Sequence, residues 1–154
     1  MKGLKIKDIS VKAKQGQYGI VFTSWNPSIV QDLLKETKKE LVSQGVDEAN
    51  IYLKEVPGAF ELPLATQFMA EKEGILSVIS LGAIIRGDTP HFDFISSSCL
   101  EGLQKVSLET RIPVICGVLT TNTIEQAEER SNPNKMNKGK EFALTALNMV
   151  DSLS

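Results

Sequence analysis

The sequence predicts an α/β protein whose four-stranded parallel sheet is covered by helices on both faces. Two observations support this prediction. Short apolar segments alternate along the chain with longer segments in which apolar residues recur every three to four positions, as expected for buried strands and amphipathic helices. No repeat or low-complexity tract interrupts the 154 residues, and a chain of this length buries roughly 70% of its unfolded surface. We therefore expect a single domain over residues 1–154.

The first strand and helix are predicted from residues 18–45. Residues 18–24 are largely apolar and form the strand. Asn26 and Pro27 mark the start of the helix, because asparagine caps helices and proline suits the first helical position. Gly45 ends it. The apolar stripe of this helix consists of Ile29, Val30, Leu33, Leu34, Thr37, Leu41 and Val42.

Two further strand–helix units follow. The second strand covers residues 51–56, and a helix follows from about residue 60 to residue 72. The third strand, residues 77–85, has the composition of a buried strand, and its helix covers residues 92–108.

One more strand and two helices complete the chain. Residues 113–119 form the strand. Thr123 and Gln126 form a capping box that opens a short helix ending near Arg130. A polar loop, residues 131–137, precedes the last helix. The apolar stripe of the last helix consists of Phe142, Leu144, Ala146, Leu147 and Val150.

This order of elements predicts a flavodoxin-like three-layer α/β/α sandwich, with right-handed crossovers and the strand order 2-1-3-4. Residues 4–11 alternate apolar and polar side chains. We expect this segment to pair with a sheet edge, and the sequence leaves open whether that edge belongs to the same subunit or to a neighbouring one.

Composition and charge exclude several classes of protein. The net charge is −2 and basic residues are mixed with acidic ones, so we expect no nonspecific binding to nucleic acid or to acidic membranes. The first ten residues lack the apolar core of a secretory signal, and no apolar segment approaches the roughly 20 residues that span a bilayer. Cys99 and Cys116 match no metal or redox spacing, and both lie in apolar segments. We therefore expect a reduced, cytoplasmic protein.

The loops at the carboxyl ends of the strands form the candidate site, because open parallel sheets bind ligands at that edge. These loops contain the only tryptophan, Trp25, and the only histidine, His91. Residues 86–90 connect a strand to the start of a helix, where free N–H groups favour anions.

Five side chains near these loops have two interpretations each. Trp25 either stacks on a flat heterocycle or packs over the following helix. Glu61 either accepts hydrogen bonds from substrate hydroxyls or stabilises a helix start through the helix dipole. His91 is either a general acid or a helix-start residue, and the neighbouring turn favours the first. Arg130 and Lys138 either bind a phosphate or, respectively, close a short helix and point into solvent.

Five motifs occur in order along the chain. They are residues 56–63 (VPGAFELP), 82–93 (GAIIRGDTPHFD), 117–120 (GVLT), 125–130 (EQAEER) and 137–139 (NKG). Together they closely resemble the motifs of the 6,7-dimethyl-8-ribityllumazine synthase family. The resemblance extends from about residue 18 to residue 150, and five motifs in register are specific where any one would be weak.

The resemblance implies a reaction. Members of the family condense 5-amino-6-(D-ribitylamino)uracil with 3,4-dihydroxy-2-butanone 4-phosphate. The products are 6,7-dimethyl-8-ribityllumazine, phosphate and water, and the step is the penultimate one of riboflavin biosynthesis. We therefore expect a transferase that uses neither a metal nor an organic cofactor.

The resemblance also implies roles for residues. His91 matches the proton donor, Trp25 the aromatic side chain that stacks on the pyrimidine, and Glu61 the carboxylate on a ribityl hydroxyl. The other pyrimidine and ribityl positions are Ala59, Phe60, Ala83, Ile84, Ile85 and Cys116. The phosphate positions are Asp88, Thr89, Arg130 and Lys138. Family sites lie between subunits, so we expect Cys116, Arg130 and Lys138 to come from a neighbour.

Two positions depart from the family pattern. Cys116 stands where phenylalanine is usual, which removes an aromatic wall between subunits. Ser24 stands where arginine is common. Neither change removes a catalytic group, so both concern substrate affinity rather than reaction type.

The resemblance further implies a homo-pentamer, and some members of the family build icosahedral 60-subunit capsids from twelve pentamers. The loop after Arg130 has no insertion of the kind that blocks capsid closure, but residues 131–136 differ from the common version. The sequence therefore leaves pentamer, decamer and 60-mer open, and likewise a partnership with riboflavin synthase.

Two other functions are considered. One is a non-catalytic relative that binds riboflavin or lumazine or mainly forms a shell, and the joint presence of Glu61, His91 and Arg130 argues against it. The other is a flavodoxin-like flavin carrier. Its phosphate loop would follow the first strand, and residues 23–27 do not resemble such a loop.

Overall fold

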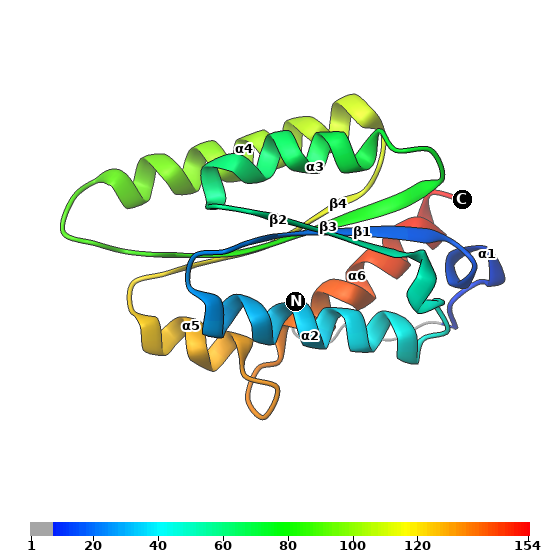
Figure 1. Ribbon diagram of the computed structural model, residues 1–154, viewed down its shortest axis with the longest axis horizontal. Helices are drawn as coiled ribbons and strands as arrows, with labels where there is room; N and C mark the ends of the chain where they lie inside the picture. The colour runs from blue at the N-terminus through cyan, green and yellow to red at the C-terminus, as the bar shows by residue number, and fades with distance from the viewer. Residues whose placement is uncertain (1–7) are drawn as a thin grey trace.

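A four-stranded sheet lies between two layers of helices in the computed structural model, which describes residues 8–154 (Figure 1). All neighbouring strands are parallel, in the spatial order β2-β1-β3-β4. The strands are β1 (Gln17–Thr23), β2 (Ile51–Val56), β3 (Ile75–Ile85) and β4 (Val114–Thr121). The predicted sandwich and its strand order 2-1-3-4 are therefore confirmed.

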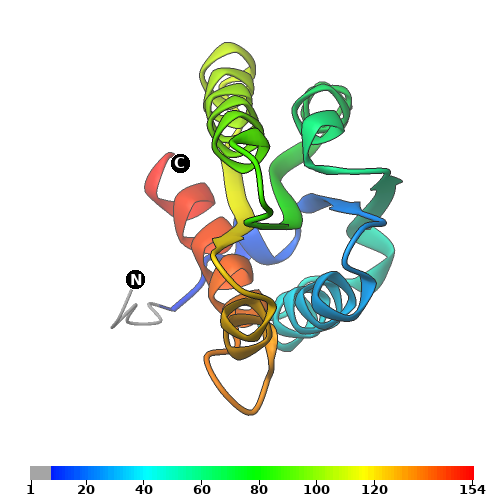
Figure 2. The same cartoon turned by 90° about the vertical axis from the view of Figure 1, so that its left-hand side faces the viewer.

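Each face of the sheet is covered by a different set of helices (Figures 1 and 2). α3 (Leu62–Ala70) and α4 (His91–Thr110) lie on one face. α2 (Pro27–Ser43), α5 (Ile124–Ser131) and α6 (Lys138–Ser152) lie on the other. The strand order reverses between β1 and β3, and a ligand crevice forms at the carboxyl ends of the strands where such a reversal occurs.

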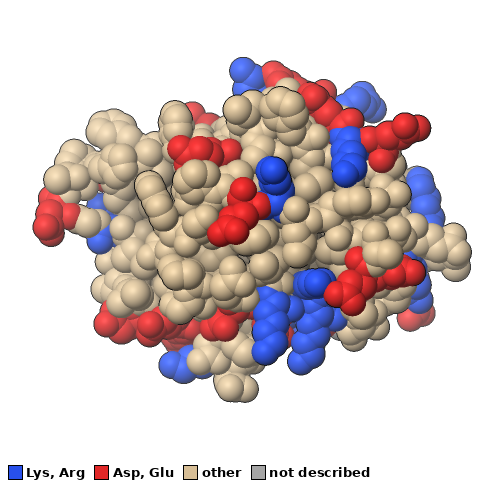
Figure 3. All heavy atoms as spheres, viewed as in Figure 1, with Lys and Arg blue, Asp and Glu red and all other residues tan. Residues whose placement is uncertain are grey.

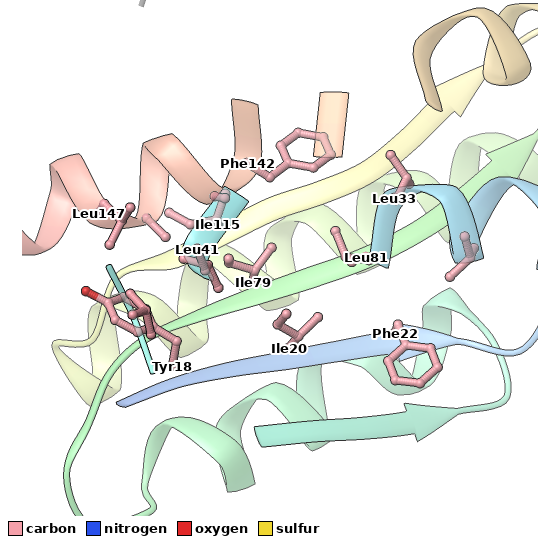
Figure 4. Packing of buried hydrophobic residues seen from close by; sticks show 14 of the residues in the cluster. Tyr18, Ile20, Phe22, Leu33, Leu41, Ile79, Leu81, Ile115, Phe142 and Leu147 are labelled. Carbon is pink, nitrogen blue, oxygen red and sulfur yellow. The ribbon is translucent and has the colours of Figure 1, made fainter. Parts of the chain in front are cut away.

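The larger apolar core fills the space between the sheet and the helices α2 and α6 (Figure 4). Successive side chains of a strand point to opposite faces. Tyr18, Ile20 and Phe22 of β1 therefore belong to this core, whereas Val21 belongs to the core beneath α3 and α4. A strand with apolar residues on both sides is what a sheet covered on both faces requires.

The predicted apolar stripes of α2 and α6 are buried, apart from two residues of α2. All five residues predicted for α6 are buried. In α2, Leu34 is half-buried and Val42 is 43% exposed, because it lies at the border of the stripe.

Several element boundaries differ from the predicted ones. The helix predicted over residues 60–72 is divided into η2 (Ala59–Glu61) and α3. β3 already begins at Ile75, directly after Gly74, whose φ of 87° suits glycine. A further short helix, η1 (Glu48–Asn50), precedes β2.

The N-terminal segment differs from the prediction in the part that the structure describes. Residues 4–7 of the predicted strand 4–11 lie outside the described residues. Ser10 and Val11 do not form a strand, because Ser10 caps the short helix α1 (Val11–Lys14) by accepting a hydrogen bond from Ala13 N. Ser10 N in turn donates to the Asp151 carboxylate at 3.1 Å, which ties α1 to the end of α6.

Asn26 precedes α2 as predicted, but its side chain does not cap the helix. Its backbone is in the left-handed region, with φ 55°. Its amide nitrogen Nδ2 instead donates to the carbonyl of Ala83 at 3.0 Å, which joins the end of β1 to the end of β3. Among residues 8–154, no helix is long and apolar enough to cross a membrane.

Candidate active site

A cavity of about 590 Å³ opens at the carboxyl ends of β1, β2 and β3. Figure 2 views this end of the molecule, with the connection from β3 to α4 crossing in front of the sheet. The lining residues lie at the ends of β1 and β3, in the segments that follow β1, β2 and β3, or in the first turns of α4. They are Thr23, Trp25, Asn26, Ala59, Phe60, Glu61, Ala83, Ile84, Ile85, Gly87, Thr89, His91, Phe92 and Ile95.

Most of the predicted site residues lie in the wall of this cavity. These are Trp25, Ala59, Phe60, Glu61, Ala83, Ile84, Ile85, Thr89 and His91. Four others do not line it, namely Asp88, Cys116, Arg130 and Lys138. The loop after β4, which we expected at the same edge, does not reach the wall either, although Asn122 in that loop contacts Arg86.

Trp25 follows β1 and is 67% exposed. Its ring lies against Gly58, where an added Cβ would be only 2.8 Å from the ring carbons Cε3 and Cζ3. Its backbone N–H donates to the carbonyl of Pro57 at 3.3 Å. The tryptophan therefore packs across the turn after β2 and presents much of its ring area to the cavity and to solvent.

Glu61 closes η2 and also lines the cavity. Its carboxylate oxygen Oε2 accepts a hydrogen bond from Gly58 N at 3.0 Å, and its own N–H donates to the carbonyl of Gly58 at 3.1 Å. Since glycine has no side chain, this reciprocal pair is a backbone version of a capping box. The pair holds the carboxylate at the cavity wall, so both interpretations of Glu61 fit its position.

His91 is the first residue of α4, and its exposed ring lines the cavity. Its N–H donates to Thr89 Oγ1 at 3.4 Å, which is a long hydrogen bond. A Cβ added at Gly87 would meet no atom within 4 Å, so the turn before the histidine has open space beside it. A ligand anion can approach this turn and the amino terminus of α4 together.

Arg130 and Lys138 are engaged with their own helices in this protomer. Arg130 Nη1 donates to the carbonyl of Gln126 at 3.0 Å within α5. Lys138 Nζ lies 2.8 Å from Glu141 Oε2, and the two side chains are 19% and 27% exposed. These contacts correspond to the helix-end interpretation of the arginine, but they correct the expectation of a freely solvated lysine.

The two cysteines have different environments. Cys99 lies on the buried face of α4 and is fully buried, and burial raises the pKa of its thiol to about 12. This thiol is therefore protonated at neutral pH and serves as a small core residue. Cys116 is exposed on β4, which is an edge strand of the sheet.

Five wall residues were not predicted as site residues, namely Thr23, Asn26, Gly87, Phe92 and Ile95. Asn26 was interpreted only as a cap, and its contact with Ala83 joins residues 57 positions apart in the sequence. Thr23 ends β1 and is buried. Phe92 and Ile95 follow His91 by one and four positions. The helical spacing of Ile95 and His91 is the sequence signal that could have found this face of α4.

A family model described as 6,7-dimethyl-8-ribityllumazine synthase matches residues 15–154. The matched range begins just before β1 and includes every residue that lines the cavity. Because the match covers nearly the whole chain, the protein belongs to the 6,7-dimethyl-8-ribityllumazine synthase family.

Proposed function

We propose that the protein condenses 5-amino-6-(D-ribitylamino)uracil with 3,4-dihydroxy-2-butanone 4-phosphate to give 6,7-dimethyl-8-ribityllumazine, phosphate and water. Family membership already implies a transferase of riboflavin biosynthesis. The observation that supports the specific reaction is the cavity that Trp25, Glu61 and His91 all line. An aromatic face, a carboxylate and an imidazole are the groups that a ribityl-pyrimidine and an acid–base step require.

The pyrimidine substrate is proposed to lie between Trp25 and the end of β3. The exposed indole ring offers a face for stacking, and such aromatic pairs contribute about 0.5–1.5 kcal/mol beyond area burial. Backbone groups of Ala83, Ile84 and Ile85 lie at the strand end, where polar edges of a heterocycle can be bound. The Glu61 carboxylate accepts hydrogen bonds from ribityl hydroxyls.

The phosphate is proposed to lie at the turn before α4. Thr89 in the cavity wall, together with Asp88 and the first N–H groups of the helix, forms this end of the site. The helix dipole favours an anion there by about 0.3–1 kcal/mol at an exposed site. That contribution is small for a dianion, so a cation is needed as well, and Arg130 and Lys138 of a neighbouring subunit are proposed to supply it.

The chemistry needs no activated nucleophile from the protein, since the substrate's own amine attacks the ketone carbonyl. Holding two reactants in line is worth about 7–11 kcal/mol in favourable cases. His91 is proposed to transfer protons while water and then phosphate leave, which contributes typically ~10²–10⁴-fold, or about 3–5 kcal/mol. Proximity is therefore the larger contribution and acid–base catalysis the smaller one.

A homo-oligomer is proposed because Arg130 and Lys138, the cations proposed for the phosphate, do not line the cavity of their own subunit. Beside the cavity, a second groove of about 700 Å³ lies between β2 and α3 and shares Phe60 and Glu61 with it. Phe60, Leu64 and Phe68 are 64%, 65% and 72% exposed there, which is unusual for large apolar side chains in a monomer. In Figure 3, uncharged side chains cover much of the end at which α3 and α4 begin. We propose a pentamer, with a capsid of twelve pentamers as the larger assembly.

The test is to mix the two substrates with the purified protein and to follow the absorbance of the lumazine. Product formation that depends on both substrates is the expected result. A protein that forms no product, but whose Trp25 fluorescence is quenched by riboflavin or lumazine, would be the non-catalytic binding relative instead. Light scattering on the same sample distinguishes a pentamer from a 60-mer.

A further inference from the structure

We infer that Arg86 is a positioning residue, which holds the turn bearing Thr89 and His91 in place and does not itself bind the phosphate. The inference rests on the proposed function, since it concerns how the proposed proton donor is held. The segment between β3 and α4 is held unevenly by hydrogen bonds among the described residues. Both ends of this segment are fixed, whereas its middle makes few hydrogen bonds.

The main chain is fixed as far as Arg86. The β3–β4 ladder ends at the pair Ile85 and Thr121, and Arg86 N adds one bond to the carbonyl of Thr121 at 2.9 Å. In the following turn, by contrast, the hydrogen bonds made among residues 8–154 are the long one from His91 N to Thr89 Oγ1 and those that begin α4. The turn therefore depends on contacts from outside itself.

The guanidinium of Arg86 supplies such contacts on three sides. Nε donates to Asn122 Oδ1 at 2.9 Å, in the loop between β4 and α5. Nη2 and Nη1 lie 3.4 and 3.5 Å from the two carboxylate oxygens of Asp93, in the first turn of α4. The central carbon lies 4.4 Å from the centre of the Phe92 ring. One planar cation at the end of β3 thus contacts the loop after β4 through a short hydrogen bond and the start of α4 through longer contacts, and we call this set of contacts the clamp.

These contacts direct the cation away from the ligand. Phe92 lines the cavity, but Arg86, which stacks on it, does not. Phe92 and Asp93 directly follow His91, so a clamp on these two residues fixes the point from which the imidazole projects. Three of the five N–H donors of the guanidinium and one of its planar faces are used in these contacts, all of which are directed to other residues of the protein.

Further hydrogen bonds connect Asn122, which Arg86 contacts, to α5. Asn122 N donates to the side-chain oxygen of Gln126 at 2.8 Å, and the carbonyl of Gln126 accepts from Arg130 Nη1 at 3.0 Å. A chain of hydrogen bonds therefore connects the turn of one site to the arginine that we propose serves the neighbouring one. Contacts within a single subunit therefore hold both the turn before α4 and the Arg130 side chain.

The replacement Arg86→Lys separates positioning from charge. Lysine keeps the positive charge but has neither the planar fork nor the Nε donor. If the arginine positions the turn, Arg86→Lys and Arg86→Met should both lower kcat by about 10- to 100-fold, since a misplacement of about 1 Å has effects of that size. Asn122→Ala should act in the same direction, and the double variant of Arg86→Lys with Asn122→Ala should be no slower than Arg86→Lys alone.

Hydrogen exchange of the peptide covering residues 86–95 provides a measurement that does not need activity. Exchange should be faster in Arg86→Lys, Arg86→Met and Asn122→Ala, and unchanged in the control Lys105→Met, which removes an exposed charge from α4. Unchanged exchange in Arg86→Lys would overturn the inference. So would a raised KM for the butanone phosphate in Arg86→Met at wild-type kcat. A wild-type protein that forms no lumazine would defeat the proposed function, whereas the exchange experiment would still decide the role of Arg86.

Discussion

Among single residues, His91 is the one that presents an imidazole to the cavity, from the first position of α4. The imidazole of His91 lies at the cavity wall without a hydrogen bond to any of the described residues 8–154, and the His91 backbone N–H makes a 3.4 Å contact with Thr89 Oγ1. A group held in this way is free to meet a substrate. Proton transfer by His91 can therefore be tested separately from the binding of both substrates by the rest of the cavity.

The replacement His91→Ala should slow turnover by about 10²-fold or more without abolishing it, because proximity remains when the proton donor is lost. The measurement is kcat for lumazine formation at saturating concentrations of both substrates. His91→Gln is the matched control: it restores bulk and hydrogen bonding but not proton transfer, so it should be as slow as His91→Ala. A wild-type kcat in both variants would show that His91 does not transfer the protons in this reaction.

The replacement Arg130→Ala should mainly raise KM for 3,4-dihydroxy-2-butanone 4-phosphate, by about 10-fold or more, since an arginine–phosphate contact is a strong charge-assisted hydrogen bond. The KM for the uracil substrate should change little. Lys39→Ala, at an exposed position of α2, serves as the control for loss of one positive charge. An effect of Arg130→Ala on both KM values alike would mean that the arginine acts through α5 rather than on the phosphate.

At the scale of elements, two helices approach each other closely where α6 begins over α2. A Cβ added at Gly139 would be 2.7 Å from the carbonyl oxygen of Leu33 and 3.0 Å from the Glu36 Cβ. At the same place the Thr37 hydroxyl donates to the carbonyl of Gly139 at 2.9 Å. Backbone and side chain thus fix the crossing of these two helices, which also sets where Lys138 stands.

The replacement Gly139→Ala should lower the free energy of unfolding by about 1–3 kcal/mol, because a methyl group in this contact forces the two helices apart. Urea unfolding of the assembled protein, at fixed protein concentration, measures it. Gly87→Ala is the control for stability, because a Cβ there meets no atom within 4 Å. Equal free energies of unfolding in the two variants would contradict the prediction, because they would mean that α2 and α6 can move apart at no cost in stability.

Most helices and strands were predicted correctly, because their apolar periodicity and their caps are local features of the sequence. The capping box of Thr123 and Gln126 is present as predicted, for example. The prediction for Asn26 was wrong in its detail. Its side chain reaches Ala83, and no local pattern shows that a carbonyl of another strand will lie within 3.0 Å.

At the scale of the whole molecule, two buried groups that lose a proton at alkaline pH, the Cys99 thiol and the Tyr18 hydroxyl, contribute to how stability changes there. Burial raises the pKa of Cys99 from its ordinary 9.0 to about 12. Burial, and secondarily the negative charge of Asp151, also raises the pKa of Tyr18 above its ordinary 10.0. The Tyr18 hydroxyl donates to the carbonyl of Ala13 at 2.8 Å, so its proton is part of the structure.

Stability should therefore decrease as the pH rises above 9.0, because the unfolded chain loses the thiol proton that the folded protein keeps until about 12. The contribution of each group is up to about 1.4 kcal/mol per pH unit. Urea midpoints measured below and above pH 9.0 should show a flatter alkaline decrease for Cys99→Ala than for the wild type. Ser98→Ala, a neutral exposed neighbour on α4, should keep the wild-type pH dependence. An identical decrease in Cys99→Ala would contradict the assignment to this thiol.

The sequence by itself determined the parallel sheet, its strand order and the edge at which the candidate site lies. Periodicity shows which segments are strands, and right-handed crossovers leave few ways to arrange them. The carboxyl ends of the strands then have to meet at one edge, which brings Trp25 and His91 to one cavity although they are far apart in the sequence.

Only the tertiary structure decided how individual side chains are used at that edge. Trp25 rests on Gly58, Asn26 reaches Ala83, and Arg86 binds Asn122 rather than pointing into the cavity. Each of these contacts joins separate elements, and its geometry is set to within a fraction of an ångström by how the helices pack on the sheet. Sequence patterns record which face of an element is buried, but they do not record such distances.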